Sequence, residues 1–505
     1  MYDTDVIVVG AGISGLCAAL SARENGANVL VLEKSPKKER GGNSAFSSGA
    51  FRFMYNGVED ILKVIPELPD EELDITDFRT YPKAQYIDDM NRLTQNRTDL
   101  NLVELLINES LHTMEWLRSK KVRFTPIYGR QAFKINGKFS FWGGLAIEAV
   151  GGGPGVINAL YDAAESEDIK VLYDANVTKL LVNDDGVHGV ELKLNGKTET
   201  IKCKSVILAT GGFQSNTEMR TRYLGAGWEL AKVRGTRFNT GDGIKMAMEI
   251  GARTFGHWSG CNAVALDFSA PEFGKLSVGN AFQKHSYPFG IMVNASGQRF
   301  LDEGADFRNF THAQIGRVIL EQPSQFAWQI FDQQVIHLLG DEYRIKETTK
   351  VKANTLEKLA EKLEGVDPNG FLDHIKKYNE AVQSDVPFNP NIKDGRGTTG
   401  LDVPKTNWAN TIEEGPFVAY KVTCGITFTF GGLKITPHCE VLDTFEKSIP
   451  GLYAAGELIG GLFYFNYPGG AGLMAGSVFG KIAGKHAANF SNERETDPNH
   501  KLFLL

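Results

Sequence analysis

Cysteine is scarce in this sequence of 505 residues, and the five cysteines stand far apart. No two of them form a C-x-x-C pair, and their spacing matches neither a zinc site nor an iron–sulfur cluster. We therefore expect reduced thiols and no metal site. The five residues are Cys17, Cys203, Cys261, Cys424 and Cys439.

Long hydrophobic runs and an excess of positive charge are also lacking. No uncharged apolar stretch reaches the length of about 18 residues that a bilayer requires, so the sequence predicts no membrane span. The formal net charge is −7, which argues against a nucleic-acid partner. The first expected strand begins at residue 5 and leaves no room for a signal peptide. We therefore expect a cytoplasmic protein.

Glycine, by contrast, is abundant, and its first cluster follows an apolar run. Val6–Val9 is typical of a strand buried on both faces, and it leads into the pattern G-x-G-x-x-G at Gly10, Gly12 and Gly15. The first glycine permits a tight turn, the second lets a pyrophosphate approach the backbone, and the third lets helix and strand pack closely. A helical pattern follows, whose N-terminus would attract the phosphates.

A second apolar run, residues 29–32, ends at Glu33. A carboxylate at this distance from the glycines is placed to accept hydrogen bonds from a ribose diol. Strand, glycine turn, helix, second strand and acidic residue together predict a dinucleotide-binding domain.

Three later segments combine glycine with a strand or with small polar residues. Residues 41–44 (GGNS) would lie against a flat ring and its side chain. Residues 205–213 form a buried strand that ends in a glycine turn, and residues 451–457 repeat that design with a final acid. Residues 177–182 and 187–192 predict a small antiparallel sheet.

These motifs, with the segment 240–243 (TGDG), resemble those of the fumarate reductase/succinate dehydrogenase flavoprotein superfamily over nearly the whole chain. The resemblance implies an α/β fold in which a Rossmann-type FAD-binding domain is interrupted by an α+β capping domain for the substrate. The FAD-binding domain would comprise residues 1–257 and 426–505, and the cap residues 258–425.

The cofactor implied by the resemblance is FAD. Some relatives hold it covalently through a histidine just after the GGN segment, but residues 44–48 (SAFSS) contain none, so we expect non-covalent FAD. The expected cofactor-binding residues are Gly10, Gly12, Ile13, Ser14, Gly15, Glu33, Lys34, Gly41, Gly42, Asn43, Ser44, Val177, Ala209, Thr210, Gly211, Asp242, Gly456, Glu457, Gly472 and Leu473.

The expected active site departs from that of fumarate reductases. After the segment GQRFLDE (297–303), Arg308 falls within one residue of the family's proton-donating arginine. Phe428 stands where that family has a histidine, and Tyr467 where it has an arginine that clamps a carboxylate. Two dicarboxylate ligands are therefore missing, so plain fumarate reduction is not expected.

Two branches of the superfamily match better. The segments 258–262 and 304–310, and the run 461–473, look like the tricarballylate dehydrogenase branch. The Tyr-Pro-Gly of residues 467–469 also resembles 3-ketosteroid dehydrogenases, in which a tyrosine and a glycine N–H bind a ketone oxygen. Here that N–H would come from Ala471 or Gly472.

We expect Arg308 and Tyr467 to be catalytic, with a nearby arginine lowering the pKa of Tyr467. Phe428 and Gly472 are expected substrate contacts. Asn262 stands where the family has a substrate-binding histidine, and His257 lies near the cap boundary; His285 and His312 are further candidates.

The predicted function is that of an FAD-dependent oxidoreductase acting on a C–C bond next to a carbonyl or carboxylate, similar to tricarballylate dehydrogenase. The alternatives are an enone or ketone desaturase or reductase similar to 3-ketosteroid dehydrogenase, or a flavin oxidase using O2. The expected partners are a small-molecule substrate and a separate electron-acceptor protein or O2.

Overall fold

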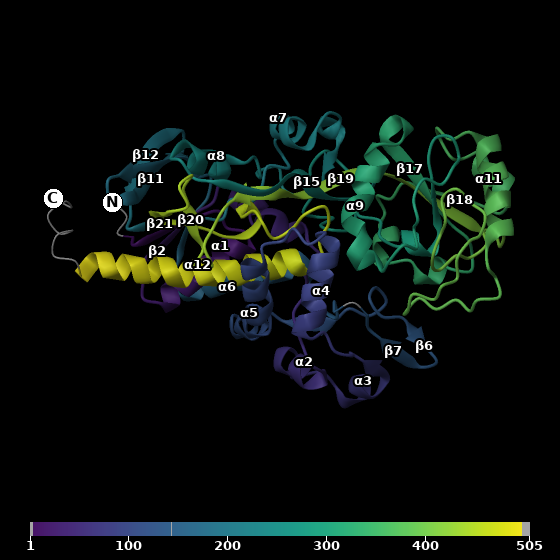
Figure 1. Ribbon diagram of the computed structural model, residues 1–505, viewed down its shortest axis with the longest axis horizontal. Coiled ribbons are helices and arrows are strands. Elements are labelled where there is room, and N and C mark those ends of the chain that lie inside the picture. Colours follow the sequence, from purple (N-terminus) through teal and green to yellow (C-terminus); the bar gives the residue numbers. More distant parts are fainter. Residues whose placement is uncertain (1–3, 143, 497–505) are drawn as a thin grey trace.

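The computed structural model describes residues 4–142 and 144–496 of the chain. The elements near the two ends of the described chain lie together in one part of the molecule, on the left in Figure 1. The green elements from α9 to α11 make up the other part, on the right. This arrangement confirms the predicted α/β fold, a Rossmann-type sheet interrupted by an α+β unit.

The central sheet carries six strands in the order β20-β21-β13-β1-β2-β9. Parallel pairing joins β1 to both of its neighbours and extends to β9 on one side and β21 on the other, and β20 is an antiparallel edge. All residues of β1 are buried, as expected for a strand covered on both faces. The strands are β1 (Val6–Val9), β2 (Val29–Leu32), β9 (Lys170–Leu172), β13 (Ser205–Leu208), β20 (Glu440–Leu442) and β21 (Ser448–Ala454).

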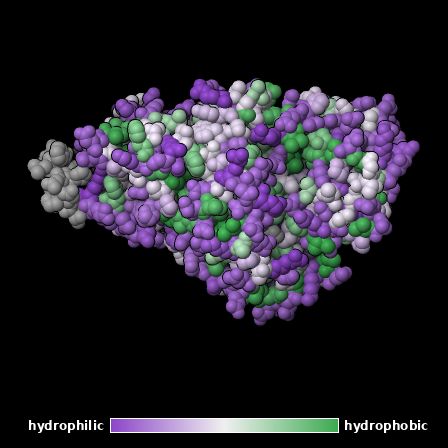
Figure 2. Space-filling view, viewed as in Figure 1, coloured by the Kyte–Doolittle hydropathy of each residue, from purple (hydrophilic) through white to green (hydrophobic). Residues whose placement is uncertain are grey.

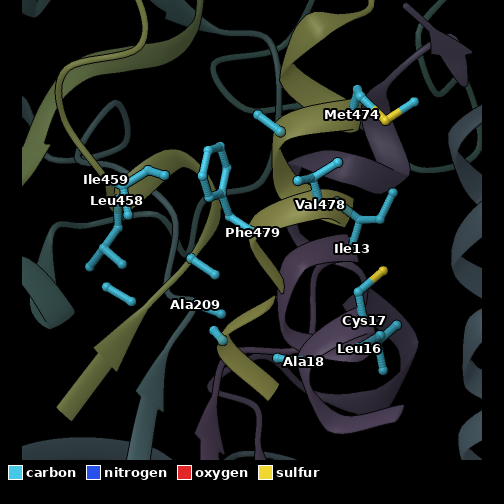
Figure 3. Close-up of a cluster of buried hydrophobic side chains, with 14 of the residues drawn as sticks. Ile13, Leu16, Cys17, Ala18, Ala209, Leu458, Ile459, Met474, Val478 and Phe479 are labelled. Carbon is cyan, nitrogen blue, oxygen red and sulfur yellow. The ribbon is translucent and has the colours of Figure 1, made fainter. Parts of the chain in front are cut away.

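The first and last helices pack directly against each other beside this sheet. They are α1 (Ile13–Glu24) and α12 (Ala471–Thr496), the long yellow helix of Figure 1. A Cβ atom on Gly480 would overlap the carbonyl oxygen of Ser14, so the close approach of the two helices requires glycine there. Figure 3 shows the apolar side chains of this contact, among them Ile13, Leu16, Cys17, Met474 and Val478.

Between β9 and β13 the chain forms a three-stranded antiparallel sheet of β10 (Asn176–Asn183), β11 (Gly186–Leu194) and β12 (Lys197–Lys202), as predicted. The chain between β2 and β9 adds further strands and helices, of which α2, α3, β6 and β7 project at the bottom of Figure 1, while α6 packs against α1. They are β3 (Ala50–Phe51), α2 (Val58–Val64), α3 (Asp70–Ile75), β4 (Thr76–Asp77), α4 (Lys83–Leu93), α5 (Leu100–Ser119), β5 (Phe124–Pro126), β6 (Lys134–Ile135), β7 (Lys138–Ser140), β8 (Ile147–Ala149) and α6 (Gly152–Ser166).

A second large sheet is built on β19 (Phe417–Leu433), a strand of 17 residues. The order is β14-β19-β17-β16, and β15 and β18 also pair with β19. The other strands are β14 (Lys232–Val233), β15 (Thr254–Asp267), β16 (Ile291–Val293), β17 (Phe326–Phe331) and β18 (Lys350–Ala353). The helices are α7 (Thr217–Met219), α8 (Asp242–Glu249), α9 (Arg308–Leu320), α10 (Leu356–Ala360) and α11 (Pro368–Ala381).

Both predicted cap boundaries fall inside paired strands of this sheet. His257 of β15 pairs with Phe430 of β19, and Ala263 pairs with Ile426, and the register shifts between His257 and Cys261 and again between Asn262 and Ala263. The division into 1–257 plus 426–505 and 258–425 stays a prediction, and residues 1–3 and 497–505 lie outside the described part.

Hydrophilic side chains cover most of the face shown in Figure 2, and the hydrophobic residues on it form separate patches. None of the helices in the described part of the chain combines the length and the apolar character that crossing a bilayer requires.

Candidate active site

One large cavity runs from the N-terminus of α1, past β19, to the start of α9. It contains about 1970 Å³ of space not filled by protein atoms, open solvent at its mouth included. Of the residues predicted to bind cofactor, all except Gly15 and Gly41 line it. Of the predicted catalytic and substrate residues, only His257 does not.

The glycine turn after β1 forms one end of the cavity. Gly10 has φ +101°, and a Cβ there would overlap the carbonyl oxygen of Ala209. At Gly12 a Cβ would meet only Ser44 Oγ at 3.6 Å and the Gly41 carbonyl oxygen at 3.7 Å, so its Cα is open to the cavity. The backbone is therefore accessible at the glycine that would face a pyrophosphate.

Glu33 is buried at the end of β2 and held by two backbone donors. Its carboxylate accepts from the N–H of Ala11 and from the N–H of Ser35, both at 2.8 Å. This fixes the carboxylate in the cavity wall, where its remaining lone pairs can accept from a ribose diol.

The predicted GGNS segment joins the cofactor end of the cavity to β19. Ser44 Oγ accepts from the N–H of Ile13 at 3.2 Å, and so satisfies one of the first donors of α1. Asn43 donates to the carbonyl oxygen of Thr427 and accepts from the N–H of Thr236 at 3.0 Å. Both side chains therefore also have structural partners.

Two further predicted residues pair with each other. Lys34 forms an ion pair with Asp242 at 2.6 Å and donates to Thr240 Oγ1 at 2.8 Å. This contact joins the end of β2 to the first residue of α8 at the cavity wall.

Glu457 lies deeper in the cavity and accepts from the N–H of Thr429 at 3.0 Å and from Gln214 Nε2 and Asn239 Nδ2 at 3.3 Å. Burial raises the pKa of its carboxyl to about 7, against the opposing effect of these donors. Thr210 Oγ1, also in the cavity wall, is buried without a partner. The open glycine backbone, fixed Glu33 and unpaired Thr210 fit a bound FAD.

At the other end, Tyr467 contacts His312 of α9. The Tyr467 hydroxyl lies 3.3 Å from His312 Nε2, and His312 Nδ1 lies 2.9 Å from the carbonyl oxygen of Arg308. A carbonyl only accepts, so Nδ1 carries the proton and Nε2 accepts from the hydroxyl. The Tyr467 proton is therefore directed at a neutral imidazole.

The titration of this pair differs from expectation. Burial raises the pKa of Tyr467 to about 12, although Arg234 and Arg52 act in the opposite direction. The predicted lowering of the Tyr467 pKa is therefore wrong, because burial outweighs the arginines. Burial also lowers the pKa of His312 to about 3, so its ring is neutral at physiological pH.

Three arginines line this end of the cavity: Arg130, Arg234 and Arg308. Arg130 is ion-paired with Glu148. Within the described chain, neither Arg234 nor Arg308 has a carboxylate at ion-pair distance. Arg308 Nη2 donates instead to the carbonyl oxygen of Arg130 at 2.9 Å, and Arg234 donates to Thr427, Phe46 and Asn280.

Several buried polar atoms in this part of the cavity wall have no protein partner. Both amide atoms of Asn309 are unpaired, and so are Asn262 Oδ1, His285 Nδ1 and Arg234 Nε. Unpaired buried polar groups are costly and usually bind something. This end of the cavity is therefore suited to a polar ligand, to which Arg234 Nε and Asn309 Nδ2 can donate and from which Asn262 Oδ1 and Asn309 Oδ1 can accept.

The structure distinguishes the two possible N–H donors at the start of α12. The N–H of Ala471 is already bonded to the carbonyl oxygen of Pro468 at 3.1 Å. Gly472 has no such partner in the described chain, and its Cα lies open beside the rings of Phe428 and Tyr467. Of the two, Gly472 is the available donor.

His257 lies away from the cavity. Its Nδ1 accepts from the N–H of Phe465 at 2.9 Å, and its ring stacks on Tyr464. Within the described residues, no group of three or more His, Cys, Asp or Glu side chains is arranged to hold a metal.

The sequence analysis missed Arg130, Arg234 and Asn309. Asn309 follows Arg308 directly on α9, but adjacent residues of a helix do not share a face, so the position of Arg308 does not indicate it. Arg130 and Arg234 come from outside the recognised motifs, and nothing in their neighbourhood in the sequence marks them.

Comparison with known proteins agrees with this geometry. Residues 5–473 match the family model FAD_binding_2, described as "FAD binding domain". The probable fumarate reductase Ifc3 of Shewanella frigidimarina is 31% identical over 97% of this chain and 76% of its own length. The 3-oxosteroid 1-dehydrogenase of Mycolicibacterium smegmatis is 27% identical over 95% of this chain and 96% of its own length.

Among solved structures, the open conformation of a flavocytochrome c3 fumarate reductase is 29% identical. It superposes with a TM-score of 0.71 over 97% of this chain and 78% of its own. These relatives agree with the predicted superfamily, and none of the three is a tricarballylate dehydrogenase.

Proposed function

The chain belongs to the FAD_binding_2 family and is an FAD-dependent oxidoreductase of the CH–CH type; within that class, we propose that it reduces a C=C bond conjugated to a carboxylate. One observation carries the proposal. Arg234 and Arg308 are half-buried cations that line the cavity, and no carboxylate of the described chain lies at ion-pair distance from either. Glu342 acts on Arg308 only from beyond that distance. A partly desolvated charge with no carboxylate in contact is costly, so an anionic substrate would stabilise this arrangement.

FAD when bound would supply the hydride for the β-carbon of the substrate. It would be held non-covalently by the open glycine backbone at Gly12, by Glu33 and by Glu457. The protein's other task is then to polarise the substrate and deliver a proton to its α-carbon.

Arg308 and Asn309 would bind the substrate carboxylate, because both present donors to the cavity from the first turn of α9. The Gly472 N–H and the Tyr467 hydroxyl are further donors at the same end. As charge develops on the substrate oxygen during hydride transfer, these donors would stabilise it.

Tyr467 is the candidate for the proton donor that reduction would require. Burial raises its pKa to about 12, so the hydroxyl is protonated at neutral pH, and it lies 3.3 Å from Nε2 of the neutral His312. Dehydrogenation would require the same groups to accept a proton instead.

A second candidate is reduction or desaturation of a ketone, as the name of the 3-oxosteroid relative suggests. The observation that favours it is that the Tyr467 side chain lies next to Gly472. The Tyr467 hydroxyl and the Gly472 N–H are two donors that could hold one carbonyl oxygen. A polycarboxylate such as tricarballylate is less favoured, because Phe428 and Tyr467 stand at positions where fumarate reductases carry carboxylate ligands.

The test is anaerobic oxidation of the dithionite-reduced enzyme, followed by the return of flavin absorbance. The panel comprises crotonate, fumarate, an enone (2-cyclohexenone) and a 3-keto-1,4-diene steroid, with tricarballylate and succinate added to the oxidised enzyme. Crotonate should restore the absorbance. Restoration by the enones alone would replace the carboxylate proposal with the ketone one, and fast oxidation only by air would favour an oxidase.

A further inference from the structure

The side chains of β19 divide the cavity into two faces. Thr429 Oγ1 accepts from the N–H of Phe213 on the cofactor side, and Thr427 Oγ1 accepts from Arg234 at the substrate end. The pairing of β15 with β19 shifts register at Thr427, and beyond it the rings of Phe428 and Phe430 lie together, 5.4 Å apart. Both phenylalanines line the cavity, so they contribute aromatic surface to it.

Phe428 is the exception in an otherwise buried strand. Every other residue of β19 is buried, and Phe428 alone keeps partial exposure. A phenylalanine in the middle of a buried strand that keeps exposed surface towards a cavity leaves apolar area in contact with water, which a ligand could cover.

Other rings surround Phe428 and extend this surface. The ring of Phe428 lies 5.0 Å from that of Tyr467, 5.4 Å from Phe430 and 6.0 Å from Phe463, measured between centroids, all edge to face. Phe463 also packs on Tyr467 at 5.4 Å. Edge-to-face clusters of this kind accept a further ring readily, because the quadrupoles favour such geometry.

The cavity therefore has a polar side and an aromatic side, and the proposed function accounts only for the polar one. His312 of α9 contacts the Tyr467 hydroxyl, and the rings of Phe428 and Phe463 pack against the Tyr467 ring. Along the aromatic side, from Ile459 to Leu473, the lining residues include no cation.

We propose that Phe428, Phe463 and Tyr467 form a subsite for a planar apolar group, so that the substrate is an unsaturated monocarboxylate with an aryl substituent. The inference rests on the proposed function for the position of the carboxylate. It adds the chemical class of the group at the other end of the double bond, an aryl substituent. A second carboxylate, as in fumarate, would have to be desolvated against these rings without a partner.

The first experiment compares cinnamate, crotonate and fumarate as oxidants of the anaerobically reduced holoenzyme. Cinnamate and crotonate share the enoate group and differ in phenyl against methyl. Burying a phenyl group in the subsite should raise kcat/KM for cinnamate at least about 10-fold over crotonate, and fumarate should be the poorest of the three. Equal use of cinnamate and crotonate, or a preference for fumarate, would overturn the subsite.

The second experiment uses Phe428→Ala, with Phe255→Leu as a control outside the cavity. Phe428→Ala should lower the cinnamate-to-crotonate ratio of kcat/KM at least fivefold, since removing the ring should affect the aryl substrate most, and Phe255→Leu should leave the ratio unchanged. A uniform loss with both substrates in Phe428→Ala would refute the assignment, because that pattern indicates a general structural defect.

Binding separates the failure of this inference from that of the proposed function. If no enoate oxidises the reduced enzyme, the proposed function fails, and the change in the flavin spectrum on adding cinnamate to oxidised enzyme then decides the subsite. A saturable shift that is weakened in Phe428→Ala supports the subsite. No shift, or the same shift in both proteins, rejects it.

Discussion

The hydroxyl of Tyr467 can be removed with little change in packing, which makes Tyr467→Phe an informative substitution. The ring keeps its contacts with Phe428 and Phe463. The hydrogen bond to His312 Nε2 is lost, which at 3.3 Å to a neutral partner is long, together with the contact of the hydroxyl with Asn262. Such a bond contributes about 1 kcal/mol or less to stability, so we predict an almost unchanged unfolding temperature and full retention of FAD.

The expected loss of activity is larger than this loss of stability. If the hydroxyl donates to the substrate during hydride transfer, its removal should slow turnover about 100-fold, which corresponds to about 2.7 kcal/mol of transition-state stabilisation. Because burial raises the pKa of Tyr467 to about 12, the hydroxyl stays protonated below about pH 11, and the loss should be independent of pH in that range.

The assay is stopped-flow oxidation of the reduced flavin under anaerobic conditions, with thermal unfolding measured on the same samples. Tyr464→Phe is the matched control, because Tyr464 stacks on His257 outside the cavity, and it should react at the wild-type rate. Normal turnover in Tyr467→Phe would refute a catalytic role. A slow variant that has also lost FAD would show that the hydroxyl maintains the fold instead.

Three further predictions follow from the same geometry. Arg308→Ala should keep FAD but lower kcat/KM for an enoate about 100-fold or more, measured in the same assay; an unchanged value would remove Arg308 from the site. Burial raises the pKa of Glu457 from 4.5 to about 7, so between these values the folded protein binds more protons than the unfolded chain, and raising the pH should destabilise the FAD-free protein by up to about 3 kcal/mol. Urea unfolding at pH 5 and pH 8 should show this loss, and Glu457→Gln should abolish it; equal pH dependence in both proteins would contradict the assignment. Gly480→Ala should cost about 1–3 kcal/mol and weaken FAD binding, because its Cβ would press on Ser14, whereas Lys485→Ala on the exposed face of α12 should not; equal unfolding temperatures would refute this.

The cofactor end of the cavity could be predicted because its requirements are local in sequence. The pattern runs over the 24 residues from the tight turn at Gly10 to the carboxylate of Glu33, which follows the next strand. Each residue there is restricted by backbone geometry: a side chain at Gly10 would overlap Ala209. Constraints of this kind leave a readable sequence signal.

The boundaries of the cap could not be read in the same way. The expected boundaries come from the resemblance to the superfamily and not from a signal in the residues around them. Both positions lie in the paired strands β15 and β19, whose register shifts between His257 and Cys261 and between Asn262 and Ala263. A strand that belongs to two layers keeps the same apolar pattern throughout, so the pattern does not show where one layer gives way to the next.

The substrate end illustrates a different limit, since its chemistry depends on which groups face each other. Arg308 and His312 are four residues apart, one turn of α9, and this spacing could have predicted that they lie on one face. That the imidazole accepts a hydrogen bond from Tyr467 depends on a residue 155 positions away. The pKa of Tyr467 was predicted in the wrong direction for the same reason: the sequence revealed nearby arginines, but the extent of burial, which dominates, follows only from the packed structure.

Substitution of the two dicarboxylate ligands by Phe428 and Tyr467 has one consequence that neither residue has alone. With their centroids 5.0 Å apart, the two rings offer a second carboxylate apolar surface and no hydrogen-bond donor except the Tyr467 hydroxyl. The same contact holds the Tyr467 hydroxyl towards His312 and the arginines, so the apolar and polar sides of the cavity meet at one side chain. A substrate that satisfies both sides must therefore place its reacting double bond between an anionic group and an apolar one. Introducing Phe428→His and Tyr467→Arg together should move the preference towards fumarate, and failure to do so would mean that the cap, rather than this pair, selects the substrate.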